Sequence, residues 1–373
     1  MRILLVGEYS NVHWTLAEGL RALGHDVTVL SDGDTWKNYP RDIDLRRSSL
    51  HTAGTLHYLA DIARVWFKLR GYDVVQLINP VFLDLRAERI WPFYSYLRKH
   101  NGKVFLGAFG IDHFWVKVGM DCTTFRYSDF NFGSQLRDYP FMHTMIDDWL
   151  EGPKGTLNLR IADDCDGIIS GLYENDLCYR PFYSDKTHFI PFPINRAAIT
   201  PANTLNFKLD TINFFIGIQR DRSSYKGTDI MLAALNRLQA DFGSERMQIV
   251  KAESVPFAQY QEMMNSSHVI LDQLYSYTPA MNALLAMAKG LIVVGGGEPE
   301  HYDLLGEHEL RPIINVQPTE QDVYDQIASR LLSGKEDIHQ LQLDSIEYIR
   351  RHHDHIAVAR RYVDVWNSSA ALH

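Results

Sequence analysis

Short apolar runs of strand length alternate with helical patterns along most of the chain, and this alternation limits the possible folds more than any other feature. The apolar run RILLVG (2–7) is followed by a helical pattern that ends at Gly24. The strand pattern DVTVL comes next. Apolar strands separated by helices are typical of a parallel sheet covered on both faces. The pattern therefore predicts β-α-β units.

The alternation occurs in two series, joined by a polar stretch with flanking prolines that we interpret as a linker over about 195–211. A length of 373 residues with 46% hydrophobic composition is sufficient for two packed cores. We expect an α/β fold with two Rossmann-like domains, 1–195 and 212–345, facing one another across a cleft. A single helix is predicted over 336–367, and its end (346–373) is expected to return to the N-terminal domain.

Residues 109–149 interrupt the first series and are rich in aromatic side chains. The aromatic residues are Phe109, Phe114, Trp115, Phe125, Tyr127, Phe130, Phe132, Tyr139, Phe141 and Trp149. Two interpretations stay open: a lid or pocket insert beside a ligand, or a loop-rich insert that packs its own small core.

Charge and cysteine content exclude several classes of protein. The formal charge of −9 comes from 37 basic and 46 acidic residues, so no nucleic-acid partner is expected. Cys122, Cys165 and Cys178 form no C-x-x-C pair, which disfavours a disulfide framework and a zinc ribbon. A reducing compartment fits these cysteines best.

The chain carries no recognisable targeting or membrane-spanning pattern. The opening MRILLVGEYS lacks a signal-peptide core, and no apolar stretch approaches the roughly 20 residues needed to cross a bilayer. We expect a cytoplasmic location. Weak association with a membrane surface stays open beside an ordinary exposed helix end, through Trp91, Tyr94, Tyr96, Arg98 and Lys99.

Several nucleotide-binding and catalytic motifs are absent. GEYSNVH follows the first strand in place of G-x-G-x-x-G, and neither a P-loop nor a G-x-S-x-G elbow occurs. The acidic pairs at 32–34 and 42–44 resemble a D-x-D metal motif, but turn chemistry explains them. His352, His353 and His355 are expected on a solvated helix face beside two arginines. No metal is therefore expected.

Basic side chains gather where the first strand of the second series ends. The segment GIQRDRSSYKGTD (217–229) places Arg220, Arg222 and Lys226 before a helix that starts just after Gly227. Cations that converge at the end of a strand can neutralise a diphosphate and stabilise it as it departs. A charged loop that only caps a helix is the alternative.

Two further loops of the second series have features of a phosphate site. Thr278 precedes Pro279 and is a predicted N-cap, which would leave the amides of 280–282 available to a phosphate. The next strand ends in a glycine run followed by Glu298 and Glu300. Glycines permit close approach of the backbone to a ligand.

At these motifs the chain resembles the retaining glycosyltransferases of the GT-B fold, in particular family four. The resemblance rests on GHDVTVL, IPFPIN, YKGTDIMLAAL and YTPAMNALLAMAKGLIVVGGGEPE, and it covers nearly the whole chain. In that family the last stretch reads approximately E-x-F-G-x-x-x-x-E-A-M-A-x-G-x-P-V-V, followed by G-G-x-x-E. The resemblance implies an acceptor-side N-terminal domain and a C-terminal domain that binds a nucleotide sugar.

This sequence departs from the family pattern at three positions. The two family glutamates, which contact the donor sugar and the ribose, fall on Tyr277 and Leu285. The family arginine of the first loop falls on Ile218, which leaves Arg220 or Arg222 as displaced candidates. Asn282, with Glu298 and Glu300, is expected to replace the lost contacts, because Asn282 lies three residues before Leu285 on the same helix face.

On the acceptor side, Phe109-Gly110-Ile111-Asp112-His113 resembles the family's His-Gly or Gly-Ser-Asp element. Asp112 and His113 are the predicted catalytic or substrate-orienting residues, and His13 is a weaker candidate. The alternative is that Asp112 caps a turn and His113 packs within the insert.

We therefore expect a hexosyltransferase-like enzyme that moves a sugar from a nucleotide-diphospho sugar to a sugar or glycan acceptor, with retention and without a cofactor. Two other functions stay open on the same fold. One is a noncatalytic nucleotide-sugar or glycan-binding protein, and the other is a UDP-sugar epimerase.

Overall fold

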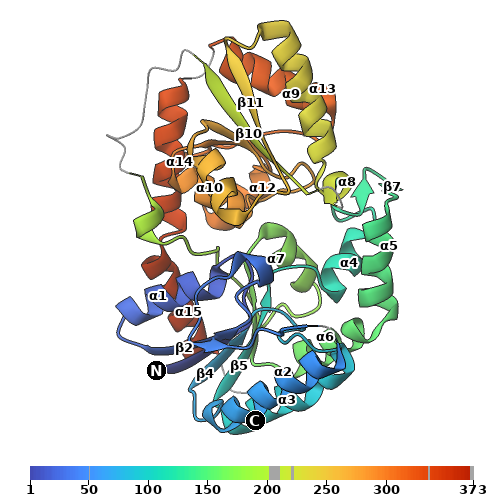
Figure 1. Ribbon diagram of the computed structural model, residues 1–373, viewed down its shortest axis with the longest axis vertical. Helices are drawn as coiled ribbons and strands as arrows, with labels where there is room; N and C mark the ends of the chain where they lie inside the picture. The colour runs from blue at the N-terminus through green and yellow to red at the C-terminus, as the bar shows by residue number, and fades with distance from the viewer. Residues whose placement is uncertain (50, 201–210, 220–221, 335–336, 370–373) are drawn as a thin grey trace. The chain divides into compact units, whose positions relative to one another are not determined.

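The computed structural model describes residues 1–49, 51–200, 211–219, 222–334 and 337–369. The chain forms two compact units (Figure 1): unit 1 is Met1–Lys117, Met145–Pro193 and His355–His373, and unit 2 is Val118–Thr144 and Ile194–Asp354. Of the expected features, Arg220 and residues 201–210 of the linker lie outside the described residues.

Unit 1 is built on a parallel sheet, as the apolar runs predict. Its strands are β1 (Arg2–Val6), β2 (Asp26–Ser31), β3 (Ile43–Asp44), β4 (Val74–Leu77), β5 (Lys103–Ala108), β8 (Gly167–Ser170) and β9 (Thr187–Phe189). They are arranged in the order β3-β2-β1-β4-β5-β8-β9. Ile3, Leu4 and Leu5 are completely buried, because helices cover both faces of the sheet.

The helices of unit 1 follow the strands as β-α-β units require. They are α1 (Val12–Ala22), α2 (Thr52–Val65), α3 (Trp91–His100), α6 (Pro153–Asp164), α7 (Tyr173–Tyr179) and α15 (His355–Ser368). Helix α15, from the end of the described chain, packs beside α1 (Figure 1). Helix α3 begins at Trp91, shortly after a short 3-10 helix at Ala87–Arg89.

Gly19 lets α1 and α15 approach closely. A Cβ atom at this position would lie 2.2 Å from the His355 carbonyl oxygen and 3.0 Å from the Ala359 Cβ. Gly19→Ala is expected to lower the free energy of unfolding by about 1–3 kcal/mol, because overpacking against backbone outweighs the better helix propensity of alanine. Urea unfolding followed by circular dichroism measures the change. Unchanged or higher stability would show that the two helices separate at no cost.

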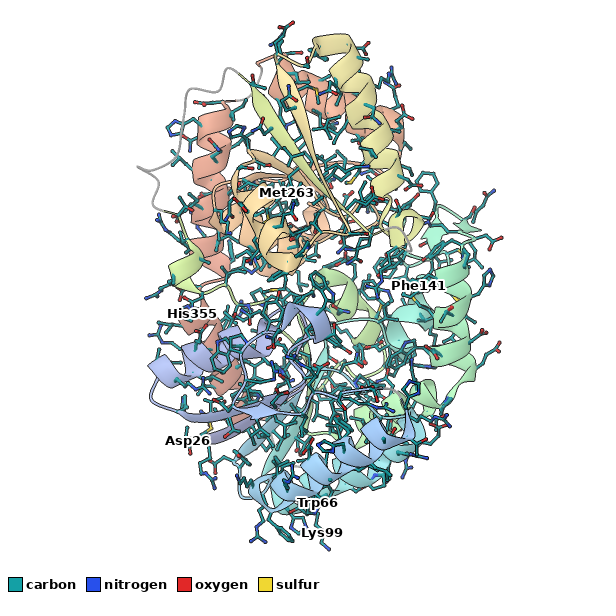
Figure 2. All side chains as sticks on the ribbon, in the orientation of Figure 1. Asp26, Trp66, Lys99, Phe141, Met263 and His355 are labelled. Carbon is teal, nitrogen blue, oxygen red and sulfur yellow. The ribbon has the colours of Figure 1, made fainter. Side chains whose placement is uncertain are left out.

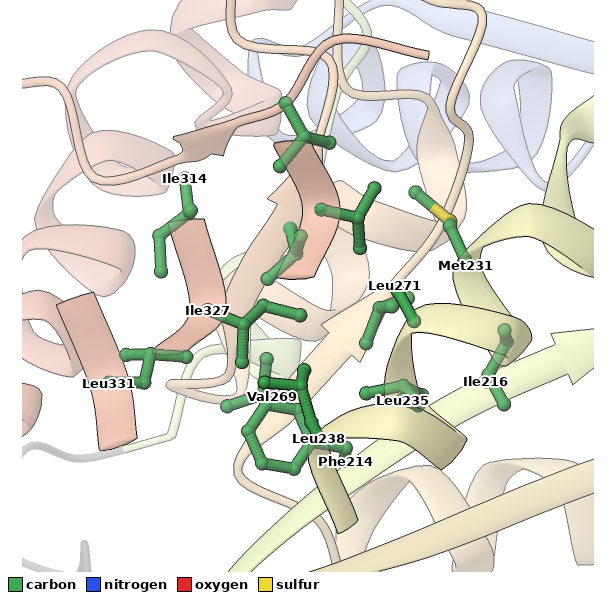
Figure 3. Packing of buried hydrophobic residues seen from close by; sticks show 14 of the residues in the cluster. Phe214, Ile216, Met231, Leu235, Leu238, Val269, Leu271, Ile314, Ile327 and Leu331 are labelled. Carbon is green, nitrogen blue, oxygen red and sulfur yellow. The ribbon is translucent and has the colours of Figure 1, made fainter. Parts of the chain in front are cut away.

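Unit 2 is built on a second parallel sheet. Its strands are β10 (Ile212–Ile218), β11 (Met247–Glu253), β12 (Val269–Leu271), β13 (Ile292–Gly295) and β14 (Ile314–Asn315). They are arranged in the order β11-β10-β12-β13-β14. The core on one side of this sheet packs Phe214 and Val269 against Leu235 and Ile327 (Figure 3).

The helices of unit 2 cover this sheet. They are α8 (Ser223–Lys226), α9 (Thr228–Phe242), α10 (Phe257–Asn265), α11 (Met281–Ala288), α12 (Pro299–Leu305), α13 (Glu320–Ile327) and α14 (Ile338–His352). The insert adds the antiparallel hairpin of β6 (Asn131–Phe132) and β7 (Gln135–Leu136). Helices α4 (His113–Gly119) and α5 (Pro140–Ile146) lead into and out of the insert.

The aromatic insert is divided between the units. All of 109–149 was expected to belong to the N-terminal domain, whereas residues 118–144 belong to unit 2. Hydrogen bonds from Arg126 and Arg137 to residues more than 80 positions further along the chain account for this placement. Nothing within the insert itself specifies these partners.

The single helix predicted over 336–367 is wrong. The structure has two helices, α14 and α15, separated at His353 and Asp354. The break is held by tertiary contacts: Ile194 N–H donates to the His353 carbonyl (2.7 Å), and Arg196 pairs with Asp354. The return to unit 1 therefore begins at His355 and not at 346.

The histidines near this break do not form the predicted solvated face. His353 is 3% exposed and His355 is 7% exposed. His352 contacts the buried carboxylate of Glu307, with 2.7 Å between Nε2 and Oε2. Tertiary packing around the break therefore covers this segment.

No helix of the described chain is both long and apolar enough to cross a membrane. Five side chains were candidates for membrane contact. Of these, only Lys99, which is labelled in Figure 2, is exposed. Tyr94 is fully buried and donates a hydrogen bond to Asp164 (2.7 Å), and Arg98 pairs with Asp166 (2.8 Å). The structure gives membrane association no support.

Candidate functional site

Each of the two parallel sheets in the described structure has one point where the strand order reverses. Ligands of open α/β sheets bind beside the carboxyl ends of the strands at such a point. In unit 2 the reversal lies between β10 and β12. The loops after these strands are joined directly, because Leu274 N–H donates to the Lys226 carbonyl (3.0 Å). Gly227 permits this contact: its φ is +72°, and a Cβ would lie 2.7 Å from the Leu274 Cβ.

Lys226, Asp272 and Asn282 lie together at this reversal point. Asp272 directly follows β12 and is 8% exposed. The Asn282 side-chain amide donates to Asp272 Oδ1 (3.1 Å). Burial raises the pKa of Asp272, and the charge of Lys226 and the Asn282 hydrogen bond only partly offset this effect. A carboxyl group thus lies beside Lys226, one of the cations that were predicted to bind a diphosphate.

The predicted N-cap at Thr278 is wrong. Helix α11 begins at Met281, and Ala280 is its N-cap residue. Thr278 is held instead in a tight turn, since Ser276 Oγ donates to the Thr278 carbonyl (2.7 Å). Thr278 itself is buried.

Glu298 and Glu300 are engaged by the insert. Arg126 Nη2 donates to Glu298 Oε2 (2.8 Å), and the same guanidinium binds Glu300. Glu298 also accepts hydrogen bonds from Tyr127 and, at 2.8 Å, from Gln317. Its side chain is 5% exposed. The hydrogen bond from Arg126 lowers the pKa of Glu300. Both carboxylates therefore hold the insert in place.

Tyr277 and Leu285, the residues at the two family glutamate positions, lie in two separate environments. The Tyr277 hydroxyl accepts a hydrogen bond from the Arg126 backbone N–H (2.8 Å), and the Arg126 guanidinium lies 4.9 Å from the centre of its ring. Burial raises the pKa of Tyr277. Leu285 lines a separate hollow with Asn265 and Lys289.

The insert also holds the loop that carries Lys226. Arg137, beside the β6–β7 hairpin, donates to the Ser224 and Tyr225 carbonyls and stacks on Tyr275 at 3.3 Å. Figure 1 shows β7 next to α8. Phe141, labelled in Figure 2, packs edge-on against Tyr225 and lies 5.2 Å from the exposed Arg222 guanidinium. The insert thus contacts all three candidate loops of unit 2.

In unit 1, Asp112 and His113 are both bound by neighbouring protein groups. Asp112 is fully buried, accepts a hydrogen bond from the Trp115 N–H (2.9 Å) at the start of α4, and accepts another from Tyr179 (2.7 Å). Burial raises the pKa of Asp112 to about 6. His113 Nδ1 lies 2.9 Å from the Trp149 carbonyl oxygen. The structure supports the alternative of a capping aspartate and a packed histidine.

His13 is also a buried residue. Its Nδ1 lies 2.8 Å from the Gly7 carbonyl oxygen, and burial lowers its pKa to about 3. The acidic pair at 32–34 forms the expected turn, in which Asp34 N–H donates to Asp32 Oδ1 (3.0 Å). Among the described residues, no three His, Cys, Asp or Glu side chains are grouped so that they could hold a metal ion.

Sequence reasoning missed Asp272 and the two insert arginines. Asp272 follows the strand pattern HVIL directly, so a search for polar residues at strand ends would have found it. Arg126 carries no such signal, because its partner Glu298 lies 172 residues away in the chain.

Comparisons by sequence found neither a family that matches this chain nor a matching curated protein. Solved structures do match. Sucrose-phosphate synthase from Thermosynechococcus elongatus is 15% identical, with a TM-score of 0.61 over 98% of each chain. HepE from Anabaena, solved with UDP and glucose, is 12% identical, with a TM-score of 0.59 over 99% of this chain and 100% of its own.

A glycosyltransferase from Rickettsia africae is similar as well, at 14% identity and a TM-score of 0.57 over 98% of this chain and 97% of its own. At these identities the similarity concerns the fold. Together with the two parallel sheets, it confirms the predicted GT-B-like fold with two Rossmann-like domains.

Proposed function

We propose that this protein is a glycosyltransferase that moves a hexosyl-type unit from a nucleotide-diphospho sugar to a sugar or glycan acceptor, with retention at the anomeric carbon. The observation that carries the proposal is the convergence of Lys226, Asp272 and Asn282 at the reversal point of the unit 2 sheet. The GT-B-like fold supports it, and so does the binding of UDP by HepE, one of the similar structures.

In this proposal the diphosphate binds beside Lys226. The ammonium group of Lys226 neutralises the charge that develops on the departing nucleotide. The exposed Arg222 adds a second cation from the same loop. The first amides of α11, which follow Ala280, provide further donors. The cations and the amides then stabilise the departing diphosphate, as a divalent ion does in other transferases.

The donor sugar binds differently from the family pattern. Tyr277 and Glu298 contact the insert, so we assign the sugar hydroxyls to Asn282 and Asp272. A carboxylate accepts strong hydrogen bonds from hydroxyl groups, and Asp272 restores one carboxylate in place of the two that the family uses. The acceptor then binds on unit 1, and the nucleotide sugar comes from a cytoplasmic supply.

Incubation with UDP-, GDP- and other nucleotide sugars, with a panel of glycoside acceptors and with or without EDTA, tests this proposal. We expect acceptor-dependent release of the nucleotide, undiminished by EDTA, and a product of unchanged anomeric configuration. Binding of a nucleotide without turnover would favour a noncatalytic binding protein. A change of sugar configuration without an acceptor would favour an epimerase. Strict dependence on a divalent ion would contradict the charge scheme.

A further inference from the structure

Unit 1 contains a cavity at the reversal point of its own sheet. The strand order reverses between β1 and β4, and the cavity opens among the segments that follow β1, β2 and β4. Its volume is about 500 Å³, enough for a monosaccharide-sized ligand. The acidic pair at 32–34 reaches it through Asp32, and the rest of its lining comes from separate stretches of unit 1.

The lining of this cavity is acidic. Glu8, Asp32 and Asp84 contribute carboxyl groups, and among the described residues that line it Lys154 is the one basic side chain. Lys154 is already paired with Asp148 (2.6 Å). The cavity therefore offers hydrogen-bond acceptors in excess of cations.

The three carboxyl groups differ in what already binds them. Both Glu8 oxygens accept backbone N–H groups at the start of α1, and burial raises the pKa of Glu8 to about 8. Asp84 lies 3.8 Å from Arg47. Asp32 is half-buried, and within the described structure no basic side chain forms an ion pair with it. Backbone N–H groups of Asp34 and Thr35 already bind Asp32, but a partly desolvated carboxylate without a counter-ion is stabilised further when a ligand supplies additional donors.

The remaining lining suits the apolar face of a sugar ring. Tyr9, Tyr58 and Phe82 lie around the cavity together with aliphatic side chains. The Tyr58 hydroxyl accepts a hydrogen bond from the Asp84 N–H (3.1 Å), which fixes the ring. Aromatic rings with a few precisely placed polar groups are typical of small-ligand sites.

We propose that this cavity is the acceptor site and that Asp32 selects an acceptor without anionic groups, with a preference for one that carries an amino group. The proposal rests on the transferase function proposed above. A hydroxyl or ammonium group of the acceptor donates to Asp32, whereas a carboxylate or phosphate on the acceptor is repelled by the same side chain.

Saturation-transfer NMR on the full chain, without any nucleotide sugar, tests the charge preference directly. The probes are a methyl glucoside, the corresponding methyl 2-amino-2-deoxyglucoside and the corresponding methyl glucuronide. We expect the amino sugar to bind on the order of tenfold more tightly than the glucuronide, with the neutral glucoside between them. Asp32→Asn should remove most of the difference between amino and neutral sugars, while its turn hydrogen bond through Oδ1 is kept.

Asp26→Asn is the matched control. Asp26, labelled in Figure 2, begins the strand that Asp32 follows, and its side chain is 72% exposed. This variant should keep the wild-type order of affinities. Equal binding of the three probes, tightest binding of the glucuronide, or no binding of any would overturn the inference. Turnover of a nucleotide sugar onto an anionic acceptor would overturn it as well, although the transferase proposal would then stand.

Discussion

Replacing Lys226 with alanine is expected to lower kcat/KM for the nucleotide sugar by about 10²- to 10³-fold. Loss of one preorganised group that stabilises developing charge typically costs this much. Lys226 is half-buried beside Asp272, so its charge acts where solvent screening is reduced. Initial rates over a range of donor concentrations measure the effect. The fall should appear mainly in kcat, because the negative charge on the departing nucleotide grows as the bond breaks.

Two variants make this test specific. Lys226→Arg keeps the charge and should retain part of the activity. Lys289→Ala removes the lysine that directly follows α11. Lys289 contacts Asn265 and lies away from the reversal point, so its loss should leave kcat/KM within about twofold. A Lys226→Ala protein that is folded and as active as the wild type would refute the assigned diphosphate site.

Arg126→Ala is expected to lower the free energy of unfolding by about 2–3 kcal/mol. Removing one partner of a buried ion pair leaves the other charge without compensation, which typically costs about 3–5 kcal/mol. The Arg126 side chain is 52% exposed, and Glu298 keeps its hydrogen bonds to Tyr127 and Gln317, so we expect a loss at or below the lower end of that range. Chemical denaturation, monitored by tryptophan fluorescence and by circular dichroism, measures the loss.

A second substitution separates the ion pair from other effects of Arg126. Once Glu298→Gln is in place, Arg126→Ala should cost clearly less than it does in the wild type, because the two groups are coupled. Arg64→Ala breaks the exposed pair with Asp61 and should change stability by less than about 0.5 kcal/mol. If Arg126→Ala has as little effect as Arg64→Ala, the insert is not held by these carboxylates.

Local patterns were enough to predict the fold. The strand runs 2–7 and 211–218 are apolar over the length of a buried strand, and burial on both faces is what such runs specify. The helix start at Thr228 was also predicted from a local signal, the glycine directly before it. Glycine readily adopts the left-handed conformation that Gly227 has in the structure.

The candidate site was less predictable because it depends on contacts between distant residues. Lys226 was found from its position after a strand, but Asp272 and Arg126 matter through partners that no local pattern names. The same limit explains the error at His353, where a helical pattern continues in sequence but contacts from Ile194 and Arg196 interrupt it. Asp112 looked available because it follows a strand, yet Tyr179 and the start of α4 enclose it.

The path of the chain between the two units has a consequence for dissecting this protein. The chain passes from one unit to the other after Lys117, Thr144, Pro193 and Asp354. A recombinant fragment that begins at Ile194 would contain the second sheet but lack Arg126 and Arg137, so Glu298 and the Ser224 carbonyl would lose their partners. Neither unit can be excised with a single cut, and proteolysis within 118–144 should weaken unit 2 although it leaves both parallel sheets intact.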